Sequence, residues 1–407
     1  MSPRTDRADR SNHGPAWRHD RSWQAGFLIG SALGAAATVA GRHAERLARR
    51  GLVDWPEVER IAIRRLAGAP GTLDAAELQA TEPLYADALA RIVPALSSAL
   101  GAGLPGVVER SAVVDREAWV RANIGSFSTL VGRLEADLLD QLIPPGGGLA
   151  KAAMALANRW VTNRQLGFLL GFMGTRVLGQ YDLALLSVEA TPGRLLFVEE
   201  NIRATAQTLG VPIGPFRTWI ALHETTHAFE FEAHPWLRPY LAKRLERQLA
   251  LFGNDTRGLG REALRGLGRA IRGEGGGEHW LERMMGPEQQ ALFRETQAVM
   301  SLLEGFSDYV MDEVGRELVS DVERISARFH ERRNKRTAFE RAILRLTGMD
   351  LKLEQYKRGE GFVRAIAQER GAPALARLWD GPETLPQPDE IEAPLRWIAR
   401  VLDGIAG

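Results

Sequence analysis

The residues His-Glu-Thr-Thr-His at 223–227 place two histidines four positions apart, with a glutamate directly after the first. On an α-helix, residues i and i+4 lie on the same face, so the rings of His223 and His227 can converge on one metal ion. Zinc binds imidazole nitrogens at about 2.0–2.1 Å. Glu224 is rotated by about 100° from His223, which directs its carboxylate toward the open coordination position. The motif therefore predicts a Zn²⁺ site with His223 and His227 as ligands and Glu224 as general base.

A third protein ligand must come from elsewhere in the chain, because two histidines leave the zinc shell incomplete. Glu304 and Asp308 stand four residues apart in a stretch rich in leucine and valine. Carboxylates buried among apolar residues must be paired or bind metal. We expect Glu304 to be the third ligand and Asp308 to accept the free ring N–H of a ligand histidine. His234, near a helix end, and His279, in a glycine-rich stretch, are weaker alternatives for the third ligand.

The composition of the chain excludes several other chemistries. Its 407 residues include no cysteine, which excludes disulfides, cysteine-ligated zinc, iron–sulfur clusters and thiol nucleophiles. The 52 lysines and arginines against 51 acidic residues give a net charge of +1, which is too small to hold a polyanion. We therefore expect no binding to nucleic acid. Apolar residues make up 45% of the chain, enough to bury a core.

Helices are the elements expected to position these residues. Apolar residues recur at three- and four-residue spacing through 42–140, around 216–222 and again around 292–314. The clearest strand is 194–198, which we interpret as part of a core sheet. Pairing of this strand with a peptide substrate is the alternative interpretation. The pattern predicts a mainly α fold with a small β-sheet.

Four segments are expected along the chain. Residues 1–22 are polar and of mixed charge, as in a disordered tail. Residues 23–41 are an uncharged segment, and a helical region follows over 42–145. A Pro-Pro-Gly-Gly-Gly break ends that region, and we expect 146–407 to form the metal-binding domain. A single compact unit over 42–407 is the alternative.

The uncharged segment 23–41 is long enough for a single membrane anchor. The 20 residues between Arg21 and Arg42 would span roughly 30 Å as a helix. A cleaved signal peptide and a soluble helix rich in alanine and glycine are the alternatives. If the segment is an anchor, we expect the protein to lie at the cell membrane. If it is not, we expect the protein to be cytoplasmic. Five arginines lie near each end of the segment, so its orientation stays open.

The order of the motifs resembles the gluzincin class of zinc peptidases, in which a Glu-x-x-x-Asp on a later helix follows the histidine motif. This resemblance implies that Glu304 is the third ligand and that Asp308 supports a ligand histidine. The separation of 77 residues between His227 and Glu304 is longer than in thermolysin-like members. The intervening insertion therefore needs a structure of its own.

Over about residues 50–400 the chain also resembles an uncharacterised bacterial family of zincin-like, gluzincin-type hydrolases. The stretches that carry this resemblance are 114–119, 178–182, 195–201, 223–237, 304–312 and 355–356. It implies a zincin-like metallopeptidase domain preceded by a helical region. Some members are labelled as associated with the biosynthesis of a deazaflavin coenzyme. Phe306, where members often carry histidine, and the apolar segment 23–41 depart from the family pattern.

These observations predict a zinc-dependent hydrolase of the metallopeptidase type. Zinc lowers the pKa of its bound water to about 7, and Glu224 would take a proton as that water attacks a peptide or amide carbonyl. Tyr309 and Tyr356 are candidates for the donor to the oxyanion, and neither is assigned. The alternatives are a catalytically idle zinc-bound scaffold that binds a partner, and a non-peptide amidohydrolase of coenzyme or cell-wall metabolism. The pattern predicts neither the substrate nor the oligomeric state.

Overall fold

The computed structural model describes most of the chain in a large compact unit. The described residues are 51, 53–104, 106–142, 148–182, 193–248, 251, 286–334 and 350–404. The large unit comprises 53–138 and the described residues from 161 onward, while 139–142 and 148–160 belong to a second unit. The predicted tail and the predicted anchor lie outside the described residues. Among the described residues, no helix has the length and apolar character needed to span a membrane. The predicted division at 145 stays a prediction.

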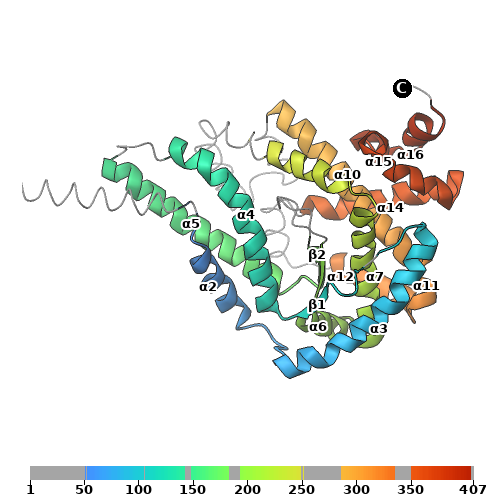
Figure 1. The fold of residues 1–407 in the computed structure, drawn as a ribbon, viewed down its shortest axis with the longest axis horizontal. Coiled ribbons are helices and arrows are strands. Elements are labelled where there is room, and N and C mark those ends of the chain that lie inside the picture. The colour runs from blue at the N-terminus through green and yellow to red at the C-terminus, as the bar shows by residue number, and fades with distance from the viewer. Residues whose placement is uncertain are drawn as a thin grey trace, which may run out of the picture. The chain divides into compact units, whose positions relative to one another are not determined.

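Helices dominate the described chain, as the apolar spacing predicts (Figure 1). The α-helices are α2 (Trp55–Leu66), α3 (Ala75–Leu100), α4 (Arg116–Leu142), α5 (Gly148–Gly174), α6 (Glu199–Leu209), α7 (Ile213–Glu232), α10 (Pro287–Glu313), α11 (Gly315–Leu318), α12 (Val322–Asn334), α14 (Asp350–Arg370), α15 (Pro388–Glu392) and α16 (Pro394–Trp397). The short turns of other helix types are η1 (Ala372–Trp379), η2 (Pro382–Thr384) and η3 (Ile398–Leu402). A further helical segment covers 237–248. The predicted fold class, mainly α with a small sheet, is confirmed.

A three-stranded sheet lies beside these helices. Its strands are β1 (Ser111–Val114), β2 (Gly179–Asp182) and β3 (Arg194–Val198), in the order β1-β3-β2. β1 is parallel and β2 antiparallel to β3. Because β3 is paired on both sides and residues 195–198 are buried, the strand predicted at 194–198 is core sheet and has no free edge for a substrate. The sequence did not predict β1 or β2, since each has only four residues.

Buried acidic residues join the end of β3 to three helices. Glu199 is fully buried and accepts hydrogen bonds from the Tyr85 hydroxyl of α3, at 2.7 Å, and from the Arg217 guanidinium of α7. Glu200 accepts the backbone N–H groups of Leu73 and of Arg116, which begins α4, both at 3.0 Å. Each buried charge is therefore paired or hydrogen-bonded, as burial requires. These contacts hold α3, α4 and α7 around the sheet.

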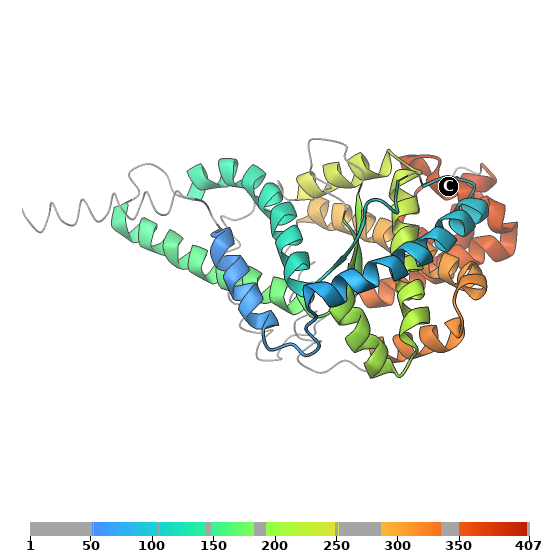
Figure 2. The same cartoon turned by 60° about the horizontal axis from the view of Figure 1, so that its bottom comes forward.

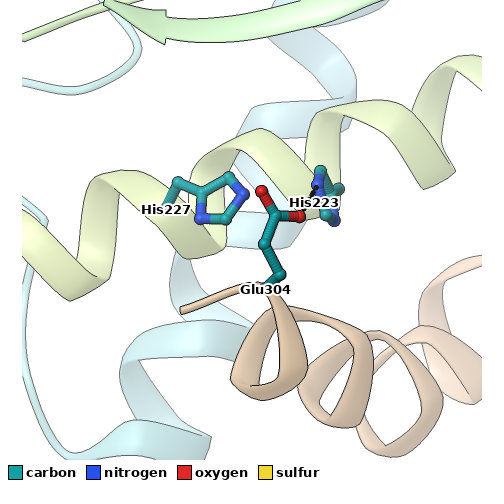
Figure 3. A group of neighbouring side chains, drawn as sticks. All are labelled: His223, His227 and Glu304. Carbon is teal, nitrogen blue, oxygen red and sulfur yellow. Dashed lines mark ion pairs between the residues drawn. The ribbon is translucent and has the colours of Figure 1, made fainter. Parts of the chain in front are cut away.

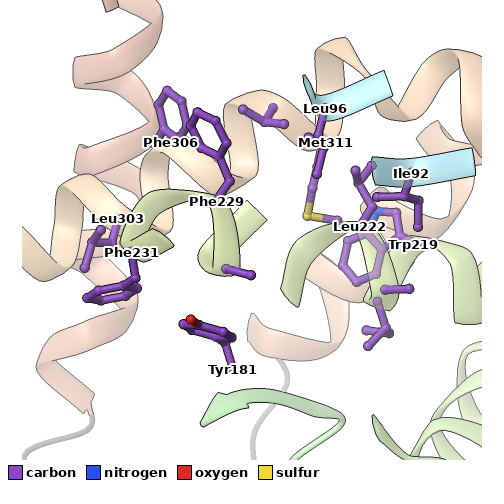
Figure 4. Packing of buried hydrophobic residues seen from close by; sticks show 14 of the residues in the cluster. Ile92, Leu96, Tyr181, Trp219, Leu222, Phe229, Phe231, Leu303, Phe306 and Met311 are labelled. Carbon is purple, nitrogen blue, oxygen red and sulfur yellow. The ribbon is translucent and has the colours of Figure 1, made fainter. Parts of the chain in front are cut away.

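The helix with the histidine motif, α7, is surrounded by apolar side chains. Figure 2 shows α3 crossing α7, and Figure 4 shows Leu96 of α3 near Leu222 of α7. On the α10 side, Phe229 lies near Phe306 and Met311 lies near Leu222 (Figure 4). These side chains belong to one continuous core. Since α7 is covered by α3, the sheet and α10, its position in the fold is strongly restricted.

Glycines bring the backbones of α10 and α14 into direct contact. A Cβ atom added to Gly305 would lie 2.1 Å from the carbonyl carbon of Gly359, and one added to Gly359 would lie 1.9 Å from the Ser301 oxygen. Only glycine allows two helix backbones to approach this closely. Gly305 directly follows Glu304, so this crossing fixes the turn of α10 that carries the predicted third ligand.

Gly359→Ala should lower the free energy of unfolding by about 1–3 kcal/mol, because the added methyl group overlaps the Ser301 carbonyl. Gly361→Ala is the matched control on the same helix, since no heavy atom lies within 4 Å of the added Cβ. Alanine has the higher helix propensity, so the control should be neutral or stabilising by up to about 1 kcal/mol. Urea unfolding measures both changes. Equal effects of the two substitutions would contradict the close crossing.

Candidate metal centre

Three side chains that could hold a metal ion come together between α7 and α10 (Figure 3). His223 and His227 project from α7 toward Glu304, which projects from α10. One donor atom from each residue can be chosen so that all three lie within 4.8 Å of one another. Nε2 of His223 lies 3.9 Å from Oε2 of Glu304. The side chains of His223 and Glu304 are each 22% exposed, so the site is reached by solvent.

The two residues between Glu224 and His227 allow the motif to lie in a packed helix. Thr225 and Thr226 are fully buried. Their hydroxyls donate hydrogen bonds back to the carbonyls of Ala221, at 2.6 Å, and Leu222, at 2.9 Å. Such bonds satisfy the polar groups within their own helix. The buried faces of α7 can therefore pack against the core while the two histidines face α10.

Glu230 forms a buried hydrogen-bonded pair with His227. Its Oε2 lies 2.8 Å from Nδ1 of His227, and its side chain is fully buried. Ser307 of α10 donates a hydrogen bond to the other oxygen, Oε1, at 3.3 Å. The sequence prediction missed Glu230. The available signal was its i+3 spacing from His227, which places both residues on one helix face.

His227 and Glu230 each change the pKa of the other. Burial alone would lower the pKa of His227, but the carboxylates of Glu230, Glu304 and Glu224 outweigh it and raise the pKa to about 10. Burial raises the pKa of Glu230 to about 7, against the opposing effect of His227. The Glu230 carboxylate therefore favours the protonated His227 ring, and the two side chains form a charge-assisted hydrogen bond.

The surroundings of His223 include the thioether of Met311. Nδ1 of His223 lies 3.1 Å from Sδ of Met311, which is buried on α10. A thioether is a weak acceptor. Asp308 lies on α10 one turn after Glu304 and is half-buried. Its predicted role as acceptor for a ligand histidine stays a prediction.

Glu224, the predicted general base, is held against β2. Its side chain is buried, and Oε2 accepts the backbone N–H of Tyr181 at 3.1 Å. Burial raises the pKa of Glu224 to about 7; His227 opposes the rise, and the Glu304 carboxylate adds to it. A Cβ atom on Gly179 would lie 2.5 Å from Cγ of Glu224, so glycine is required where β2 passes this side chain.

β2 is attached to helices through the side chains of two neighbouring residues. The Tyr181 hydroxyl donates a hydrogen bond to Glu232, at the end of α7, at 2.9 Å. Glu232 also pairs with Arg110 at 2.5 Å. Gln180 accepts the indole N–H of Trp119, on α4, at 2.7 Å. Residues of three stretches that carry the family resemblance thus meet around β2, which fixes its position beside Glu224.

The alternative ligand His234 has a different environment. Its Nδ1 donates a hydrogen bond to the main-chain carbonyl of Glu230 at 2.8 Å, and its ring stacks on Trp379 with centroids 4.8 Å apart. Burial lowers the pKa of His234. Phe306, where the resemblance departs from its family, contacts the same Trp379 ring edge-on at 5.0 Å. In the described part of the chain, the metal-forming group does not include His234.

Three further residues were candidates from the sequence: Tyr309 and Tyr356 for the oxyanion donor, and His279 for the third ligand. Tyr309 is half-buried on α10, packs against the hydrophobic core, and has its pKa raised mainly by burial. Tyr356 lies on α14, and its side chain is not among those described. His279 lies outside the described residues. The donor to the oxyanion stays unassigned.

Comparison with known proteins identifies the family. The family model for zincin-like metallopeptidases matches residues 53–398, which is most of the chain. The chain therefore belongs to the zincin-like metallopeptidase family. A crystal structure from Chloroflexus aurantiacus, described as that of "a putative hydrolase with a novel fold", is similar with a TM-score of 0.63 and 37% sequence identity. The similarity covers 86% of this chain and 99% of that one. No curated protein matches the chain significantly.

His234→Phe should leave the metal content unchanged, because phenylalanine keeps a ring on Trp379 and removes both nitrogens. His223→Ala should abolish stoichiometric metal, because a ligand is lost. Elemental analysis of the purified variants after dialysis against zinc measures both effects. Loss of metal from His234→Phe, in a variant that stays folded, would assign His234 to the metal shell instead.

Proposed function

We propose that this protein is a zinc-dependent hydrolase that cleaves peptide or amide bonds at the site formed by His223, His227 and Glu304. The observation that carries the proposal is the position of Glu224, a buried carboxylate on the same helix turn as two convergent histidines. Membership of the zincin-like metallopeptidase family supports it, and so does the similarity to a protein described as a hydrolase.

The donor set fits zinc. Two imidazoles and one carboxylate make up the protein shell of many catalytic zinc sites, whereas calcium and magnesium prefer oxygen ligands. The third donor, Glu304, comes from a later helix, which agrees with the gluzincin-type arrangement. When bound, zinc would polarise a carbonyl group and lower the pKa of a water molecule into the neutral range.

Glu224 is the group we assign to move the proton. Its pKa of about 7 allows it to accept a proton near neutral pH and to return it to a leaving amine. The Tyr181 N–H engages Oε2, so we assign the proton transfer to Oε1. The same N–H keeps the carboxylate from rotating away from the histidines. Glu224 thereby combines a suitable pKa with a fixed orientation.

The catalytically idle scaffold is the less favoured function. A purely structural metal site is closed by four protein ligands and has no use for a base such as Glu224 beside an open coordination position. Hydrolysis of a non-peptide amide differs from peptide hydrolysis only in its substrate. The relation to deazaflavin coenzyme biosynthesis stays a prediction of the resemblance.

Glu224→Gln should reduce hydrolysis by about 10²–10⁴-fold while the zinc content stays at one ion per chain, because the amide cannot act as a base. Digestion of a peptide library, read by mass spectrometry with metal analysis of the same samples, measures both quantities. Small non-peptide amides are tested as a second set of substrates in the same way. Zinc binding without cleavage of either set by the unmodified chain would favour the scaffold, and full activity of the variant would remove Glu224 from the mechanism.

Gly179→Ala should lower kcat/KM by about 10–100-fold without loss of zinc, because the new methyl group displaces Glu224 by roughly an ångström. Gly125→Ala, on α4, is the control, since its added Cβ has no heavy atom within 4 Å. The kcat/KM values of the two variants are compared by steady-state kinetics on a peptide that the library digest identifies. Thermal melting verifies that both variants are folded. Unchanged kinetics in a folded Gly179→Ala protein would show that β2 does not position the base.

A further inference from the structure

We propose that Glu230 is a positioning residue of the metal centre: it fixes the tautomer of His227 and supplies a second negative charge to the site. The inference rests on the metal site of the proposed function and assigns it a residue beyond the three ligands. Neither the histidine motif nor the metal-forming group includes Glu230.

The direction of one hydrogen bond fixes the tautomer of His227. A carboxylate can only accept, so the contact of 2.8 Å between Oε2 of Glu230 and Nδ1 of His227 places the proton on Nδ1. In the neutral ring, Nε2 then carries the lone pair that a metal ion requires. Figure 3 shows the His227 ring beside the Glu304 carboxylate, on the side where the three donors converge.

Glu230 is itself held in place by a contact from α10. Its other oxygen, Oε1, accepts the hydroxyl of Ser307 at 3.3 Å, and Ser307 lies three residues after Glu304 on α10. One carboxylate thus connects the helix of the two histidines to the helix of the third ligand. A change at Glu230 would alter both the His227 ring and the register of α7 against α10.

The buried carboxylate of Glu230 also affects the charge of the site. Glu230 has no exposed surface, and a buried carboxylate is destabilising unless positive charge compensates it. A divalent cation held by His223, His227 and Glu304 would be compensated by two carboxylates, Glu304 directly and Glu230 through the His227 ring. Acceptors of this kind make an imidazole a stronger ligand, and their removal typically weakens metal binding by 10–100-fold.

Glu230→Gln tests this role, because glutamine keeps the size of the side chain and can still accept the Nδ1–H bond but carries no charge. Zinc affinity, measured by competition with a chelator, should fall by about 10–100-fold. The visible absorption spectrum of the cobalt-substituted protein should shift, which a change in stability alone would not cause. Glu295→Gln is the control, since it removes the same charge from an exposed side chain of α10 that pairs with Arg244, and it should change neither quantity.

Ser307→Ala is the second variant and decides the test if Glu230→Gln does not fold. The Ser307 hydroxyl contacts Oε1 of Glu230 and Nδ1 of His227, both at 3.3 Å, so its loss loosens the hydrogen-bonded pair. Zinc binding should weaken severalfold and the cobalt spectrum should shift in the same direction. Unchanged zinc affinity and spectrum in the folded variants would overturn the role of Glu230. Failure of the unmodified chain to bind zinc would overturn the metal site and this role together. Weaker binding in the variants, with no hydrolysis by the unmodified chain, would support the role and refute the hydrolase.

Discussion

The packing of α7 against α10 is the constraint on which the site depends, because each helix supplies donors that the other lacks. The two histidines are related by the period of a single helix, but Glu304 reaches them only when α10 lies in the correct register. Two contacts restrict the position of α10. The Gly305–Gly359 crossing fixes α10 against α14, and the Ser307–Glu230 bond ties it to α7. Small residues and a hydroxyl thus determine where a carboxylate lies.

The general base, Glu224, is positioned by a different element, the strand β2. This four-residue strand is held to β3 by pairing, to α4 through Gln180 and to α7 through Tyr181. Those attachments place one backbone N–H against Glu224, and Gly179 leaves the space that its side chain occupies. The metal ligands and the base therefore depend on different parts of the fold, so a substitution can disturb one of them and spare the other.

The sequence predicted the features that depend on local periodicity. The pair His223 and His227, the strand at 194–198 and the helices follow from spacing within one element. Glu304 was predicted from its residue type, its apolar neighbours and a resemblance, although 77 residues separate it from His227. Contacts of β2 are non-local, and a strand of four residues shows no reliable alternation, so the contact of Gly179 with Glu224 could not be predicted. The contact of Glu230 with His227 could have been predicted, because their i+3 spacing is visible in the sequence.

Glu224 and Glu230 show why a shifted pKa does not by itself assign a role. Burial raises the pKa of both carboxyls to about 7. Glu230 has an imidazole on one oxygen and a hydroxyl on the other, so proton exchange at either oxygen would break a contact that positions His227. Glu224 has a backbone N–H on one oxygen, which orients the carboxylate without requiring its charge. The base must gain and lose a proton without moving a metal ligand. Oε1 of Glu224 can do so, whereas both oxygens of Glu230 hold contacts that position His227. This difference in hydrogen-bond partners favours Glu224 as the base.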